Sequence, residues 1–406
     1  MRELVGLAVG FTVIIVMILK KVNIGTTMLV ASIVMGFVAG FGPMKVLNVL
    51  FFSITERATV QLLTVIIIIC ILSYLLKKYG VLNKMADSLE ELFNNNWFSL
   101  MFLPLLVGVL SVPGGAVMSA PVVDSVGDKM GIGNVRKSAI NVVFRHLSFF
   151  LFPFSTTMIL ASQISGISPY TIIKYNAPIG IVSIIAGYMI YVRSSVKAAA
   201  GEAVRSTKGI LKRIGAALMY TSPLWIGVLF NLAFGLPFFI ALLPGIAIAY
   251  FLGGKDKGNF LRELVHGIDW KMVYSVAGIM CLQGFIKQMP SVAQWINDLL
   301  ASGMDVRILI ILSTAVLGII TANSSAVLGM LLPLFLPLAG GVYSEAYITS
   351  LIFASAFAFY YISPMHLCAV FTAEYFKVSI KEYYWEYRLF WPILLLTIIV
   401  LYFLVY

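Results

Sequence analysis

A short polar segment at residues 321–325 separates two apolar segments, 308–319 and 326–339. Its hydroxyl and amide oxygens suit a hard cation such as Na⁺, and a helix that begins beside them presents free N–H groups that suit an anion. Each apolar segment would form a helix of about 18–21 Å, whereas the hydrocarbon core of a bilayer is about 30 Å thick. We therefore predict a re-entrant hairpin over 308–339. The candidate ligands at its tip are Thr321, Asn323, Ser324 and Ser325.

A second pair of short apolar segments, in the first half of the chain, predicts a matching hairpin over 98–128. Its two arms, 98–110 and 117–128, enclose the sequence Ser-Val-Pro-Gly-Gly-Ala at 111–116. Non-helical backbone is tolerated at membrane depth only where it is buried in protein or lines a wet cavity, so both tips indicate a cavity. Glycine also lets a solute approach bare backbone closely. The candidate binding residues of this tip are Ser111, Pro113, Gly114 and Gly115.

Two longer apolar helices each contain a proline beside polar residues. In the segment 135–165 this proline is Pro153, and in 345–376 it is Pro364. Proline lacks an N–H group and clashes with the preceding turn, so we expect each helix to break there. Both breaks would meet the hairpin tips in one mid-membrane region, unless the polar residues serve only backbone hydrogen bonding and close packing. The candidate substrate ligands at the breaks are Ser155, Thr156, Thr157, Ser363 and His366.

Arg145 is a charged residue inside an apolar helix, about two turns before Pro153 and on the same face as Asn141. A charge at the centre of a span costs about 3 kcal/mol on insertion scales, which makes Arg145 a functional candidate. One interpretation is that Arg145 and Asn141 bind an anionic substrate. The other is that Arg145 forms an ion pair with Asp124 in the returning arm of the first hairpin, and the two are compatible. We interpret the adjacent His146 as a packing residue.

The composition assigns the chain to the polytopic membrane proteins. Of its 406 residues 61% are hydrophobic and 11% are charged, and the mean hydropathy is +0.99. A soluble chain of this length could not bury so much apolar surface. The net charge of +11 does not indicate a nucleic-acid partner, because Lys and Arg gather in short segments between apolar runs, as in cytoplasmic loops. The cysteines Cys70, Cys281 and Cys368 lie in apolar runs, and we interpret them as core residues.

The apolar segments form two series of the same order. The first series is 4–19, 24–42, 58–76, 98–128, 135–165 and 170–192, and the second is 214–234, 236–253, 270–288, 308–339, 345–376 and 383–405. The offset is about 211 residues, as between Gly42 and Gly253. This pattern predicts an all-α fold of two repeats, 1–192 and 214–406, joined by the basic linker 193–213.

Each predicted repeat contains five spans, one of them broken at proline, and one re-entrant hairpin. Because five is odd, the two repeats would have opposite orientations in the membrane. The linker 193–213 carries six basic residues and one acid, so the positive-inside rule places it in the cytoplasm and both termini outside the cell (inner) membrane. Lys20 and Lys21 follow the apolar segment 4–19 where a signal peptide would have a small-residue cleavage site, so we interpret that segment as the first span.

Opposed hairpins, each followed by a broken helix within an inverted repeat, resemble the ion transporter superfamily over essentially the whole chain. That group includes divalent-anion/sodium symporters and citrate and gluconate permeases, and the sequence is most similar to an uncharacterised integral membrane family within it. The resemblance implies an elevator-type homodimer whose moving domains bind cation and substrate at the tips and breaks. Segment 321–325 resembles the Ser-Asn-Thr tip of the sodium symporters, with Asn323 and Ser324 in reverse order. The first tip contains neither Asn nor Thr, so a first Na⁺ site there would need backbone carbonyls and residues 155–157.

These features predict a secondary active transporter, a Na⁺- or H⁺-coupled symporter of a small organic anion that works by alternating access. Candidate cation-coupling residues are Asp124, Thr321, Asn323 and Ser324. A cation/proton antiporter is the alternative, and it would need a buried carboxylate such as Asp124. A membrane enzyme is a third possibility, but the chain lacks the HExxH, GxSxG and phosphate-loop motifs. We expect no cofactor except possible Na⁺, and we expect the anionic substrate, membrane lipid and a second copy of the chain as partners.

Overall fold

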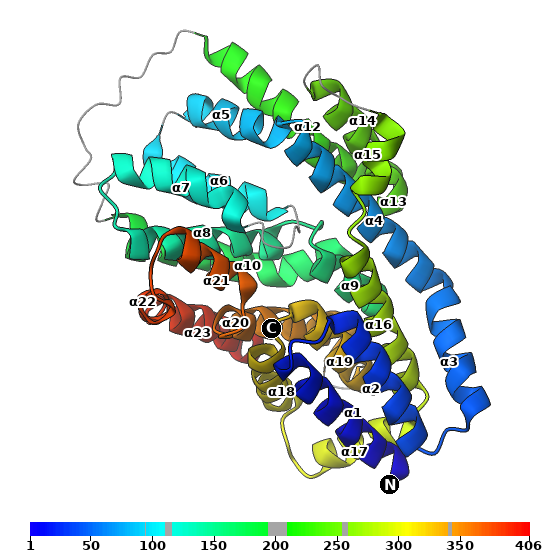
Figure 1. Cartoon of the computed structure of the whole chain (residues 1–406). Coiled ribbons are helices and arrows are strands. Elements are labelled where there is room, and N and C mark those ends of the chain that lie inside the picture. The colour runs from blue at the N-terminus through cyan, green and yellow to red at the C-terminus, as the bar shows by residue number, and fades with distance from the viewer. Residues whose placement is uncertain (94, 110–115, 194–208, 254–258, 340–342) are drawn as a thin grey trace.

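The computed structural model describes residues 1–93, 95–109, 116–193, 209–253, 259–339 and 343–406, and every regular element in these ranges is a helix (Figure 1). Five of the described helices are long and apolar enough to cross a membrane, and a sixth candidate is a pair of helices bent by 47°. The predicted all-α architecture with several apolar helices is therefore confirmed. The five candidates are Arg2–Leu19, Arg57–Lys78, Asn134–Ser165, Pro169–Val192 and Ile210–Phe234, and the bent pair is Ile380–Glu386 with Phe390–Val405.

The described residues of the first half form ten α-helices, and a short π-helix, Tyr188–Val192, continues the tenth. In chain order they are α1 (Arg2–Leu19), α2 (Ile24–Val38), α3 (Pro43–Thr55), α4 (Arg57–Lys78), α5 (Val81–Phe93), α6 (Asn96–Val109), α7 (Ala116–Lys129), α8 (Asn134–Leu151), α9 (Thr156–Ser165) and α10 (Pro169–Gly187).

The second half begins with a long helix and ends with the bent pair. Its helices are α12 (Ile210–Phe234), α13 (Phe238–Ala241), α14 (Leu243–Leu252), α15 (Phe260–His266), α16 (Trp270–Lys287), α17 (Pro290–Ala301), α18 (Val306–Thr321), α19 (Ser324–Phe335), α20 (Glu345–Tyr361), α21 (Leu367–Tyr375), α22 (Ile380–Glu386) and α23 (Phe390–Val400). A 3₁₀ turn, Leu336–Leu338, follows α19, and a π-helix, Leu401–Val405, follows α23.

Four described helices were not predicted from apolar runs: α3, α5, α15 and α17. Helix α5 shows why, because it is amphipathic and too polar to read as a span. It buries Leu82, Met85 and Leu89 on one face and exposes Asp87 on another. The single span predicted at 236–253 is instead the two short helices α13 and α14.

Local chemistry accounts for the two broken helices. Helix α8 ends at Leu151 and α9 begins at Thr156, so the interruption contains Pro153. Helix α20 ends at Tyr361 and α21 begins at Leu367, so the second interruption contains Pro364. In both cases the proline removes a backbone donor and disfavours helical geometry in the residue before it.

Helices α8 and α20 form the centre of the protein. Every residue from 137 to 148 in α8 and from 347 to 359 in α20 is buried. Helix α6 packs closely on α8 at Gly108, where an added Cβ atom would lie only 1.9 Å from the carbonyl oxygen of Arg145. Glycine is therefore needed at this crossing, which fixes the backbone around Arg145.

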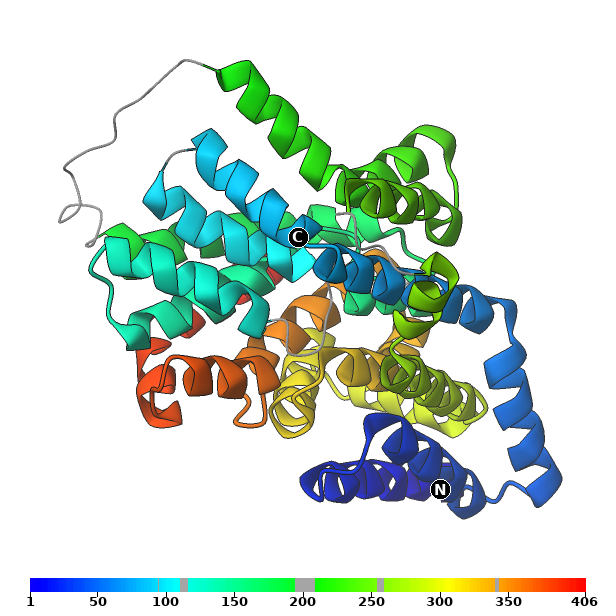
Figure 2. The same cartoon turned by 45° about the horizontal axis from the view of Figure 1, so that its top comes forward.

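The outer helices of the two halves lie on opposite sides of this centre. In Figures 1 and 2, α1 and α2 lie at one side and α12 to α14 at the other, with α8, α9 and α20 between them. Helix α2 packs on α16 of the second half, and α14 packs on α4 of the first half. The two halves are thus interleaved, and a site at the centre receives residues from both.

Candidate functional site

A cavity of about 220 Å³, here called the central cavity, lies between the two halves of the chain. Its polar lining comes from α8, the start of α9, the turn between α18 and α19, the end of α20 and the start of α21. The polar lining residues that were predicted as site residues are Arg145, Thr156, Thr157, Asn323, Ser324 and Ser325. A larger hollow of about 630 Å³, beside α1 and α18, is almost wholly apolar and contains none of the predicted site residues.

The turn between α18 and α19 projects its polar groups into the central cavity. Ala322 has a left-handed backbone conformation, with φ of +46°, which ends α18 after Thr321. The side chain of Asn323 then caps α19 by accepting a hydrogen bond from the N–H of Ala326 at 2.8 Å. Ser324 follows as the first residue of α19, so its hydroxyl lies at the cavity wall.

The break between α8 and α9 meets this turn directly. The hydroxyl oxygen of Thr157 lies 2.9 Å from that of Ser325 and 3.2 Å from that of Ser324. Ser155 does not line the cavity, and instead caps α9 by accepting a hydrogen bond from the N–H of Met158 at 3.0 Å. Three hydroxyls from two halves of the chain therefore converge on one point.

Three of the helices that the structure describes begin at the wall of the central cavity. They are α9, α19 and α21, whose first residues are Thr156, Ser324 and Leu367, and each of these residues lines the cavity. The first N–H groups of a helix lack intrahelical partners and carry partial positive charge. Three such ends around one small cavity make its potential positive and give it donors for an anion.

Arg145 adds a full positive charge to the same wall. Its side chain is only 3% exposed, and Nη1 donates a hydrogen bond to the carbonyl oxygen of Val107 in α6 at 3.3 Å. Among the lining residues that the structure describes, Arg145 is the one charged side chain. The positive potential of the cavity therefore favours an anionic substrate over a cationic one.

The predicted ion pair between Arg145 and Asp124 is wrong. Asp124 forms its ion pair with Lys137, which is 2% exposed and also donates to Asp128 at 2.7 Å. Lys137 precedes Arg145 by eight residues, which is about 12 Å along α8, so the two cations serve different places. Asp124 is 37% exposed and does not line the central cavity, so the structure does not bring it to the predicted cation-coupling position.

Two other predicted residues hold helices together near the cavity. Asn141 accepts from the Ser119 hydroxyl at 2.6 Å and donates to the carbonyl oxygen of Ala116 at 2.8 Å and to the Thr372 hydroxyl at 3.1 Å. It thus joins α8 to α7 and α21. Ser363 donates to the carbonyl oxygen of Ile319 at 2.6 Å and joins the second break to α18. Neither side chain lines the cavity.

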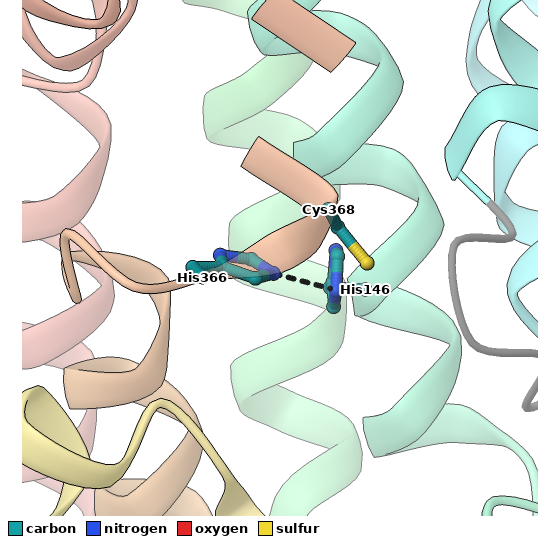
Figure 3. A group of neighbouring side chains, drawn as sticks. All are labelled: His146, His366 and Cys368. Atoms are coloured by element: carbon teal, nitrogen blue, oxygen red, sulfur yellow. Dashed lines mark hydrogen bonds between the residues drawn. The ribbon is translucent and has the colours of Figure 1, made fainter. Parts of the chain in front are cut away.

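His366 is fully buried beneath the cavity wall and faces His146 across the two halves of the chain (Figure 3). Their Nε2 atoms lie 3.3 Å apart, and Nδ1 of His146 lies 2.7 Å from the carbonyl oxygen of Val142. The thiol of Cys368 lies beside this pair. His146 and Cys368 line the cavity. The sequence offered no signal that His146 would meet His366, and the one signal for Cys368 was its position two residues after His366.

Part of the prediction lies outside the described residues, namely Ser111, Pro113, Gly114 and Gly115. Thr321 lies just behind the turn, where its hydroxyl accepts a hydrogen bond from the N–H of Asn323 at 3.3 Å. Sequence reasoning missed the lining residues Met272 and Tyr360, because both belong to apolar runs that look like ordinary core.

The fold is shared with a known transporter. The crystal structure of the YdaH transporter of Alcanivorax borkumensis is similar with a TM-score of 0.60 at 13% sequence identity, over 87% of this chain and 86% of that one. At this identity the likeness shows the fold alone. No curated protein matches the sequence. The sequence does match the family described as "Protein of unknown function (DUF401)" over residues 3–406. Because this match spans almost the whole chain, the protein belongs to the DUF401 family.

Proposed function

We propose that this protein is a secondary active transporter that carries a small organic anion, a carboxylate, across the cell membrane by alternating access. The observation that carries the proposal is the meeting of three helix N-termini and the Arg145 side chain at the central cavity. The fold shared with YdaH supports the general class. The choice of substrate rests on the cavity.

A carboxylate fits the chemistry of the cavity. Free N–H groups at helix starts and a guanidinium group are the donors that carboxylates prefer, and arginine binds a carboxylate through two parallel hydrogen bonds. The volume of about 220 Å³ is below the roughly 300–1,000 Å³ of sites for drug-sized ligands, so the substrate is small. The aromatic and apolar lining residues Phe149, Met272 and Tyr360 would contact its carbon skeleton.

The coupling ion in this proposal is Na⁺ or H⁺. The hydroxyls of Ser324 and Ser325 each lie within 3.2 Å of the Thr157 hydroxyl, and such neutral oxygens are suitable Na⁺ ligands. The facing imidazoles of His146 and His366 are the groups that would take up a proton instead. An antiporter is less well supported, because no carboxylate lines the cavity among the described residues and Asp124 pairs with Lys137.

The inverted repeat belongs to the same proposal. An offset of 211 residues carries the starts of α8 and α9, 134 and 156, to 345 and 367, where α20 and α21 start. Contacts between the two halves also occur in matching pairs. Helix α19 packs on α9 as α7 packs on α21, and α2 packs on α16 as α14 packs on α4. Two halves of opposite orientation around one site are a known basis of alternating access. An elevator-type motion, a homodimer, external termini and a relation to the ion transporter superfamily follow as further proposals.

A ligand screen by thermal stability tests the proposal. Because a ligand that binds only the folded state stabilises it, by about 2.7 kcal/mol at 100 times its Kd, purified protein should melt at a higher temperature with some small carboxylates. The screen is run with and without Na⁺, and at two pH values, to identify the coupling ion. Arg145→Ala should lose the shift, whereas Arg262→Ala, at an exposed arginine in α15, should keep it. A shift of the same size in Arg145→Ala would refute the assignment of the site.

A further inference from the structure

We propose that His146, His366 and Cys368 form a binding site for a divalent transition-metal ion, with Zn²⁺ as the probe. The potential ligand atoms, one from each residue, all lie within 4.8 Å of one another (Figure 3). His146 comes from the middle of α8, and His366 and Cys368 come from the break before α21 and its first turn. A metal ion here would therefore join the two halves of the chain beside the central cavity.

The distance between the imidazoles fits a tetrahedral site. With Zn–N bonds of about 2.0–2.1 Å, two nitrogens at the tetrahedral angle lie roughly 3.3–3.4 Å apart. The Nε2 atoms of His146 and His366 lie 3.3 Å apart. A thiolate at about 2.3 Å from the zinc would lie about 3.6 Å from each nitrogen. The Cys368 sulfur lies within 4.8 Å of a ring nitrogen of each histidine, so a shift of about 1 Å would bring it to a bonding position.

The surroundings prepare two of the three ligands. Nδ1 of His146 lies 2.7 Å from the Val142 carbonyl oxygen, which can only accept a hydrogen bond. The proton of His146 is thus on Nδ1, and Nε2 presents its lone pair, as in metal sites where a carbonyl orients the histidine. Cys368 lines the central cavity beside Arg145, whose positive charge would lie next to a metal-bound thiolate.

The site would leave a fourth position open. Two neutral imidazoles and one thiolate leave a charge of +1 on bound Zn²⁺, and Arg145 adds a further positive charge nearby. An anionic ligand in the central cavity, which Cys368 and His146 both line, would offset that charge and complete a tetrahedron. This last step rests on the proposed function, whereas metal binding by the three side chains does not.

Metal binding is tested on the full-length protein in detergent, with no transport assay. Metal-free protein is titrated with Zn²⁺ against a chromophoric chelator, and then with Co²⁺ while its absorption spectrum is recorded. We expect one Zn²⁺ per chain. We also expect the visible bands of tetrahedral Co²⁺ together with a thiolate-to-cobalt charge-transfer band, which reports a sulfur ligand directly.

Single substitutions assign the ligands. Cys368→Ser, which is nearly isosteric, should abolish the charge-transfer band, and His146→Ala and His366→Ala should weaken Zn²⁺ binding at least about tenfold. The matched controls are Cys281→Ser and His266→Ala, which alter a cysteine and a histidine outside the cluster and should bind like the parent. A parent protein without stoichiometric binding, or a Cys368→Ser variant that keeps the charge-transfer band, would overturn the proposal. If a histidine variant fails to fold, the cysteine variant still decides.

Discussion

Replacement of Arg145 by lysine separates the charge of this residue from its geometry. Lysine keeps the positive charge but cannot form two parallel hydrogen bonds with a carboxylate. Loss of one charge-assisted hydrogen bond costs about 1.5–3 kcal/mol, and roughly 1.4 kcal/mol corresponds to a tenfold change in affinity. We therefore expect Arg145→Lys to bind the substrate about 10- to 150-fold more weakly. The hydrogen bond to Val107 is also charge-assisted, so its loss should lower the free energy of unfolding by about 1.5–3 kcal/mol.

Isothermal titration calorimetry of the purified variant measures this effect, with the carboxylate that stabilises the parent protein as ligand. Arg262→Lys is the control, because that side chain is exposed and distant from the site in sequence. Affinity within twofold of the parent would refute a carboxylate contact at Arg145. Adding Asp124→Ala to Arg145→Ala should restore neither stability nor binding, because Asp124 pairs with Lys137.

Three further predictions concern other parts of the structure. Thr157→Val removes the hydroxyl that joins the two halves, so the Na⁺ affinity measured from melting temperatures should fall at least fivefold, whereas Thr157→Ser should keep that affinity. Equal Na⁺ titration curves for the parent protein and Thr157→Val would contradict this role. Lys137→Met leaves Asp124 without its buried partner and should lower stability by about 2 kcal/mol, less than the roughly 3–5 kcal/mol for a fully buried pair because Asp124 is partly solvated. Adding Asp124→Asn should recover part of that loss in a denaturation experiment. Cysteines placed at Lys212 and Ser344 of a cysteine-free protein should react with an impermeant reagent from opposite sides of sealed vesicles, and same-side labelling would contradict the inverted repeat.

Local rules explain what could be predicted from the sequence. Composition indicates a polytopic membrane protein, and the series of apolar segments predicts that it is all-helical. Pro153 and Pro364 act through their own missing N–H groups, and Asn323 acts by capping the helix that follows it, so a single sequence is enough to locate these features.

What the sequence could not provide is the set of contacts between distant segments. An ion pair with Asp124 was one of two interpretations of Arg145, because Asp124 lies in the returning arm of the first hairpin, yet the structure pairs Asp124 with Lys137 instead. His146 and His366 are 220 residues apart, and Cys368 looked like an ordinary core residue, so their meeting depends on packing between the two halves. Short amphipathic helices such as α5 were not predicted, because a helix that is polar on one face does not form a continuous apolar run.

Uptake of a labelled carboxylate into proteoliposomes tests the central claim most directly. The carboxylate is the one that stabilises the purified protein, and the vesicles carry an inward gradient of Na⁺ or of H⁺. We expect the carboxylate to accumulate above its external concentration under one of these gradients. The accumulation should be lost when an ionophore collapses that gradient. The Arg145→Lys variant should need a higher substrate concentration for the same rate. If the parent protein brings the carboxylate only to equilibrium, or does not move it at all, the account of a coupled anion transporter is contradicted.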